Sequence, residues 1–207
     1  MDLRLAGRPT IDLLVVFAVV FVFQWVLSLA SVPLVTSLFV LSAPLLNEPW
    51  ALVTSVYAHG SVSHMLSNAM GLVLFGLLVE RVTTRWRFHV FFLTVGVASG
   101  AAEIFWQGFL GAGAGVVGAS GGVLGLLGYL LAGNAIADRT VGRLSLGVRE
   151  QIVLFGAIAV AITYVTMGPD VAVVGHFVGL VLGLVAGRMQ LLHVGRGGAG
   201  ARESASL

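Results

Sequence analysis

VGASGGVLGLLGY, residues 117–129, places a single serine among glycines at the start of an apolar run. Ser120 follows Gly118 by two positions, and Gly121 and Gly122 come directly after it. In a soluble chain, Gly-x-Ser-x-Gly between a strand and a helix would suggest a nucleophile. Here no alternating strand precedes Ser120, and the apolar run that follows is typical of a membrane helix. Small residues are equally typical of close packing between membrane helices. Ser120 alone leaves both readings open.

The composition indicates an integral membrane protein. Of 207 residues, 58% are hydrophobic and 10% are charged, and the mean hydropathy is +1.03. A soluble domain carries roughly a quarter charged residues, so this chain can bury its apolar surface only in lipid. There is no cysteine, which excludes disulfides and thiolate metal sites. A net charge of +2, scattered along the chain, gives no indication of nucleic-acid binding.

Apolar stretches predict an all-α bundle of six transmembrane helices, since a span needs about 20 apolar residues. The predicted spans are residues 11–31, 64–82, 88–107, 119–135, 151–167 and 171–191. They divide the chain into an N-terminal segment (1–10), a membrane domain (11–191) and a disordered tail (192–207). The first outer loop, 32–60, is long and contains Trp50, so we expect it to lie in the membrane interface.

Arginine placement predicts the orientation. All basic residues are arginines, and they occur before the first span, in or at the edge of the second and fourth loops, and at or beyond the end of the sixth span. By the positive-inside rule, both termini and these two loops are cytoplasmic. We therefore expect a multi-pass protein of the cell membrane.

Four polar side chains are predicted to lie at one depth, near the outer face. His64 and Ser120 fall in the first turns of the second and fourth spans, and His176 lies about a turn and a half into the sixth. Asn68 is one turn below His64 on the same helical face. Each has an ordinary alternative as a helix–helix hydrogen bond or an interfacial ring. Polar groups inside spans are nevertheless expensive, and four at one depth indicate a functional site.

Glycine spacing predicts which helices meet. Gly175, Gly179, Gly183 and Gly187 recur every four residues in the sixth span, and Gly121, Gly125 and Gly128 line the fourth. Such faces allow backbones to approach closely, which would set His176 against Ser120. A histidine within hydrogen-bond reach activates a serine. Since no acidic residue is obviously placed to orient the histidine, the sequence predicts a Ser-His dyad. His64, Asn68 and the Ser120 N–H are the available oxyanion donors.

Three motifs in this order resemble those of rhomboid intramembrane serine proteases, in the six-span form of bacteria and archaea. They are His59-x4-His64-x3-Asn68, Gly118-Ala-Ser120-Gly121 and Gly175-His176-x2-Gly179-x3-Gly183, and the likeness runs from about residue 49 to 187. The resemblance implies that Ser120 is the nucleophile and His176 the base, with His64, Asn68 and the Ser120 amide as the oxyanion site. The fifth helix and the loop before the sixth would form a gate.

Trp50 and Glu80 also match family positions, whereas three residues depart from the pattern. Ala51 stands where Arg is frequent, Leu124 where Tyr or Phe is frequent, and Gly175 where Ala is usual.

The resemblance implies an endopeptidase that cuts a transmembrane substrate protein near its outer end, in the lipid bilayer. No cofactor, metal or nucleic acid is expected, and the oligomeric state stays open. A first alternative is an inactive relative that only binds membrane helices, although such proteins generally lose the Ser or the His. A second, a zinc protein using His59, His64 and His176, lacks a His-Glu-x-x-His motif. A third, a transporter, would show inverted repeats.

Overall fold

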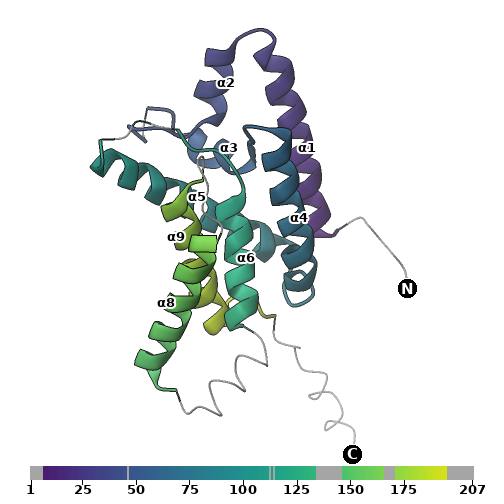
Figure 1. Cartoon of the computed structure of the whole chain (residues 1–207). Coiled ribbons are helices and arrows are strands. Elements are labelled where there is room, and N and C mark those ends of the chain that lie inside the picture. Colours follow the sequence, from purple (N-terminus) through teal and green to yellow (C-terminus); the bar gives the residue numbers. More distant parts are fainter. Residues whose placement is uncertain are drawn as a thin grey trace, which may run out of the picture.

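The computed structural model describes residues 7–45, 47–111, 113, 115–133, 146–165 and 171–194. Within these ranges, helices account for the regular structure, and one isolated antiparallel bridge joins Leu41 to Val116. The helices are α1 (Pro9–Ser28), α2 (Val32–Phe39), α3 (Ala51–Tyr57), α4 (Val62–Val79), α5 (Arg85–Phe109), α6 (Ser120–Ala132), α8 (Val148–Val165) and α9 (Val173–Arg188). Figure 1 shows their arrangement.

Each of the six predicted spans coincides with a helix, but the helix ends differ by a few residues. The helix α1 stops at Ser28 because Ser31 caps α2, accepting the Leu34 N–H at 3.3 Å. The helix α5 starts three residues earlier than expected because Thr84 caps it. By length and hydropathy, α1, α4 and α5 are long enough to cross a membrane, whereas α6 and α9 are shorter apolar helices. The six-span count therefore stays a prediction.

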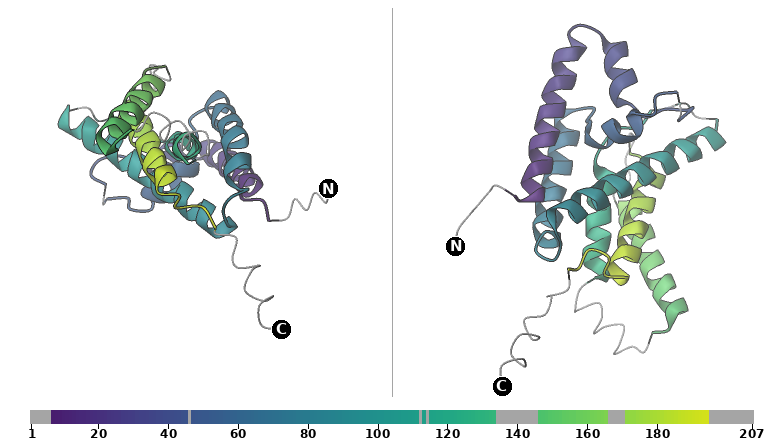
Figure 2. Two further views of the ribbon diagram at one scale, coloured as in Figure 1. Left: turned by 90° about the horizontal axis from the view of Figure 1, so that it is seen from below. Right: turned by 180° about the vertical axis from the view of Figure 1, so that it is seen from behind.

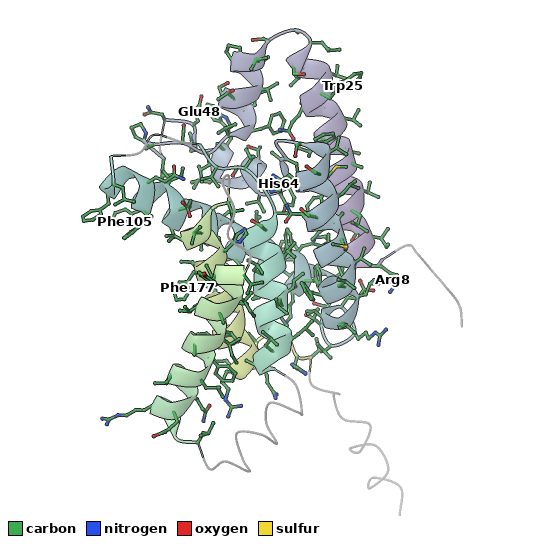
Figure 3. All side chains as sticks on the ribbon, in the orientation of Figure 1. Arg8, Trp25, Glu48, His64, Phe105 and Phe177 are labelled. Carbon is green, nitrogen blue, oxygen red and sulfur yellow. The ribbon has the colours of Figure 1, made fainter. Side chains whose placement is uncertain are left out.

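The surface of the helices is rich in exposed apolar side chains. Trp25 on α1 and Phe105 on α5 point outward, and Phe105 is 77% exposed (Figure 3). In water such a surface would drive association. Together with the three long apolar helices, it identifies a membrane protein.

The helix α6 is at the centre of the bundle. It packs against α4, α5 and α9, and Figure 2 shows it end-on between its neighbours. Most of its residues are buried, as expected for a helix that is apolar on all sides. Its 13 residues span only about 20 Å at 1.5 Å per residue, less than the roughly 30 Å of a bilayer core. Ser120 is its first residue and is partly buried.

The predicted glycine contact between α6 and α9 is confirmed. A side-chain carbon on Gly179 would overlap the carbonyl group of Gly121, and one on Gly183 would overlap that of Gly125. One turn further, Gly187 packs in the same way against Tyr129. The two backbones touch along more than two turns, which leaves no room for a methyl group.

Both ends of the described chain lie at the turn between α4 and α5. Arg8 pairs with Glu80 at 2.7 Å, and the Val194 N–H donates to Val82 O at 3.0 Å. The Tyr129 hydroxyl also meets His193 Nδ1 at 2.6 Å. The two ends thus share one end of the bundle, as predicted, although which membrane face this is stays a prediction. Of the predicted N-terminal segment (1–10) and the predicted disordered tail (192–207), residues 1–6 and 195–207 lie outside the described residues.

Candidate active site

A glycine with a positive φ lies two residues before Ser120. Gly118 has a φ of +126°, and its N–H donates to Ser55 O at 2.9 Å. Few residues other than glycine adopt this conformation. A side-chain carbon here would also lie 2.6 Å from Cε1 and 2.7 Å from Nε2 of His64. Gly118 therefore lets the chain pass over the His64 ring and start α6 at Ser120, a partly buried residue.

The helix α4 brings His64 and Asn68 to this loop. Ser61 caps α4 by accepting the His64 N–H at 3.1 Å, which fixes the first turn. Asn68, one turn later, is buried and donates from Nδ2 to His64 O at 3.1 Å. Its Nδ2 lies 3.8 Å from the position of a side-chain carbon on Gly118. An Asn amide has two N–H groups, so a second donor remains beside the loop.

The helix α9 places His176 at the level of Ser120. Gly179, three residues after His176, crosses α6 at Gly121, the residue after Ser120. His176 is partly buried, and His64 lies within electrostatic reach of its ring. The structure thus brings the predicted residues Ser120, His176, His64 and Asn68 from three helices to one region.

Glu103 belongs to the same region, although it is not among the site residues predicted from the sequence. Its side chain on α5 is buried, and Oε2 accepts the Gly175 N–H at 2.9 Å. It also lies within electrostatic reach of His176. Its signal in the sequence is an acidic residue within the apolar stretch 88–107, but its partner on α9 lies 72 residues further along the chain.

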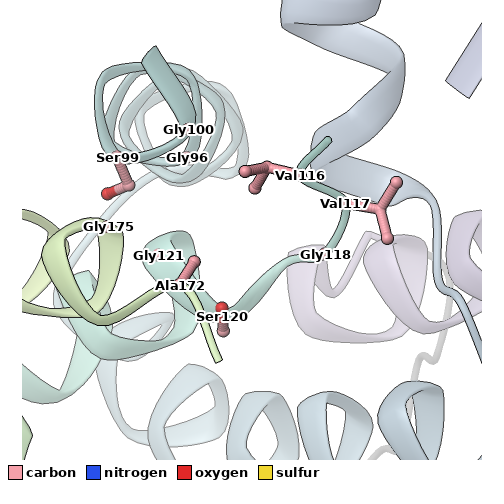
Figure 4. Close-up of a pocket in the computed structure, with 10 residues that line it drawn as sticks. All are labelled: Gly96, Ser99, Gly100, Val116, Val117, Gly118, Ser120, Gly121, Ala172 and Gly175. Atoms are coloured by element: carbon pink, nitrogen blue, oxygen red, sulfur yellow. The ribbon is translucent and has the colours of Figure 1, made fainter. Parts of the chain in front are cut away.

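A small cavity of about 20 Å³ adjoins Ser120 (Figure 4). Its walls come from α5 (Ser99), the loop before α6 (Val116 and Gly118), and the start of α9 (Gly175). Ser99 Oγ is buried without a hydrogen-bond partner among the described residues. A volume of this size admits one water molecule.

His59 packs below this region as a buried ring. The ring lies edge-on to Phe17 at 4.9 Å and to His64 at 5.3 Å between centroids, and the backbone N–H of His59 donates to Gln24 Oε1 at 3.0 Å. Within the described chain, no three His, Cys, Asp or Glu side chains group as metal ligands would. The structure therefore gives no support to the zinc alternative.

The structure shows what surrounds the three residues that depart from the family pattern. Ala51 starts α3, and the neighbouring Trp50 donates from Nε1 to Ser37 O at 2.9 Å. Leu124 is 8% exposed in an apolar cluster with Leu180 of α9. Gly175 is close to α5, since a side-chain carbon on it would lie 3.1 Å from Ser99 O. Packing with α9 and α5 thus accounts for Leu124 and Gly175.

Comparison with known families places the chain in one of them. The family model described as Rhomboid domain matches residues 46–193, more than two thirds of the sequence. A search of curated proteins finds no match to the chain.

Proposed function

This chain belongs to the rhomboid family, and we propose that it is an intramembrane serine endopeptidase. Its substrate is a transmembrane protein, which it cuts near the outer end of a membrane helix. Ser120 is the nucleophile and His176 the general base. One observation carries this assignment: the backbone contact of Gly179 with Gly121, which holds the His176 turn of α9 against the first turn of α6.

In the proposed mechanism, Ser120 Oγ attacks the scissile carbonyl carbon while its proton passes to His176. The C–O bond that forms turns the carbonyl oxygen into an oxyanion. His176 then donates the proton to the leaving amide nitrogen, the C–N bond breaks, and an acyl-enzyme remains. A water molecule repeats these steps to release the acid and restore Ser120. The bundle supplies a low-dielectric setting in which each charge matters more than in water.

The oxyanion is stabilised by donors that the fold aligns in advance. Ser120 is the first residue of α6, so its N–H has no acceptor within the helix, and the positive end of the helix dipole lies there. His64 and Asn68 flank the same loop through Gly118. Fixed donors need no reorganisation as the charge develops, which is why they accelerate the reaction.

The substrate enters past α8, the proposed gate. This helix packs mainly on α9, through an apolar cluster that contains Ala159 of α8 and Leu180 of α9. The loop that would complete the gate includes residues 166–170, which lie outside the described residues. We propose that the site opens toward the outer face of the cell membrane, with both termini in the cytoplasm.

The test compares purified protein in lipid vesicles with two variants. Wild type is expected to cleave a fluorescent transmembrane substrate and to react with a serine-directed fluorophosphonate probe. Ser120→Ala should abolish both, and His176→Ala should reduce both to background, while helix content stays constant. Ser28→Ala, at the end of α1, is the matched control and should behave like wild type.

Three results would overturn the proposal. Cleavage that survives in Ser120→Ala would show that Ser120 is not the nucleophile. Loss of cleavage on addition of a chelator would indicate a metal site. Wild type that binds membrane helices without cleavage or labelling would be the inactive relative.

A further inference from the structure

Glu103 is a buried carboxylate for which the dyad mechanism has no role. It lies on α5 and is 6% exposed. Isolated ionised carboxylates in an apolar interior are strongly unfavourable, so a buried acid needs partners. The partners of Glu103 lead to the catalytic histidine.

Both carboxylate oxygens accept hydrogen bonds. Oε2 accepts the Gly175 N–H at 2.9 Å, and Oε1 accepts from Gln107 Nε2 at 3.2 Å. In both contacts the partner is the donor and the Glu103 oxygen is the acceptor. An ionised carboxylate offers acceptors alone, whereas the protonated acid would need an acceptor for its O–H. The contacts therefore match the charged form.

The Gly175 N–H is in the first turn of α9, where backbone N–H groups have no partner within the helix. The helix α9 starts at Val173, and its N-cap residue Ala172 has no side-chain acceptor. The first N–H groups of a helix lack intrahelical partners and carry a partial positive charge. Glu103 thus caps α9 from a neighbouring helix, at the residue directly before His176.

The approach is close because residue 175 is glycine. A side-chain carbon there would lie 3.1 Å from Ser99 O and 3.6 Å from Glu103 Cβ. The start of α9 is therefore held against α5 by one hydrogen bond and by direct packing. His176 is the next residue, so the position of its ring depends on this contact.

We propose that Glu103 is the positioning residue of His176, resting on the proposed function. Its carboxylate anchors the first turn of α9 and balances the charge that His176 acquires when it takes the Ser120 proton. The site is then a dyad assisted by a buried acid on a third helix.

Few charged or titratable groups of the described residues face His176. His64 approaches from α4 and Glu103 from α5, and both act electrostatically on the ring. On α6 the nearby polar group is Ser120. On α8, Tyr164 lies at the same end of the bundle but is largely exposed. Among the described residues, Glu103 is a negative charge available to an imidazolium at this position.

Glu103→Gln separates the charge from the hydrogen bond. The amide oxygen can still accept the Gly175 N–H, so the unfolding temperature and KM should stay close to wild type. Loss of the charge should lower kcat about 3- to 10-fold, and should move the acidic limb of the kcat–pH profile down by about 0.5–1 unit, since one pH unit corresponds to a tenfold difference in stabilisation. Labelling of Ser120 should slow in parallel.

Gln107→Ala is the matched control, because it removes one hydrogen bond to Glu103 and leaves the charge in place. Its pH profile should coincide with that of wild type. Glu103→Leu removes both charge and acceptor, and should lower kcat further and weaken hydrogen-exchange protection of the Gly175 amide.

Two outcomes separate the inference from the function on which it rests. If Glu103→Gln shows the wild-type kcat and pH profile, Glu103 is only structural and the inference fails while the protease stands. If wild type neither cleaves nor labels at Ser120, the proposed function fails first. If the hydrogen-exchange protection of the Gly175 amide is unchanged in Glu103→Leu, the anchoring role is overturned, whether or not the protein is active.

Discussion

Replacing Gly179 by alanine tests the contact that aligns the dyad. The added carbon would lie 3.0 Å from both C and Cα of Gly121 and still closer to the Gly121 carbonyl oxygen. Carbon atoms pack comfortably at about 3.5–4.0 Å. Backbone atoms cannot rotate away, so α6 and α9 must move apart by about 0.5–1 Å.

Stability and activity should respond differently to this shift. Alanine favours a helix over glycine by about 1 kcal/mol, whereas overpacking costs about 1–3 kcal/mol. The net loss of stability is therefore only about 0–2 kcal/mol. A hydrogen bond between Ser120 and His176 must stay within about 2.6–3.2 Å, and a misplacement near 1 Å costs about 10²-fold in rate. We expect kcat to fall about 10- to 100-fold.

The assay is cleavage of a transmembrane substrate in vesicles, with the unfolding temperature measured in parallel. Gly108→Ala on α5 is the matched control, because no atom lies within 4 Å of the added carbon. Gly133→Ala on the α6 side is unsuitable as a control, because the added carbon would lie 3.0 Å from Gly187 O. Gly183→Ala meets Gly125 C and Cα at 2.8 Å, so it should destabilise at least as much as Gly179→Ala, while its distance from Ser120 by another turn makes the loss of activity smaller. Wild-type kcat in Gly179→Ala would refute the alignment of Ser120 and His176 through this contact.

Two further predictions concern the histidines and Asn68. His64→Ala and Asn68→Ala should each lower kcat by up to about 10²–10³-fold with little change in KM, because an oxyanion donor acts only in the transition state; a change confined to KM would assign them to substrate binding. Burial and the neighbouring His64 lower the pKa of His59 from 6.5 to about 4, so between these values the unfolded chain binds a proton that the folded protein does not. Stability should therefore fall by about 2 kcal/mol from pH 7 to pH 5, seen as a lower unfolding temperature in detergent; an equal decrease in His59→Gln would contradict this origin.

Part of the site was predictable because its signals are local. A helix that is apolar throughout must be buried, and glycines every four residues create a face on which only backbone can pack. Residues 121, 125, 179 and 183 carry this information in the sequence alone, and the structure confirms the contact. The motif around Ser120 and the order of the three motifs were enough to name the family, which the match over residues 46–193 shows.

The contact of Glu103 with α9 could not be predicted from the sequence. Its spacing to Gly175 is 72 residues, and no periodicity connects an acid on one helix to an N–H on another. The same holds for the His64 ring against Gly118, whose φ of +126° depends on the path of the loop.

The sequence by itself determined the class of protein, the helices that match the six predicted spans, the family and the candidate residues, because hydropathy, helical period and motif spacing depend on near neighbours in the chain. It did not predict α2 and α3, which lie in the segment 32–60 that was expected to be a loop. Only the tertiary structure decided the path of the loop over the His64 ring, the closeness of α9 to α5, and the partner of the buried acid. These depend on how far two backbones approach, and that distance is set by the side chains of several helices at once.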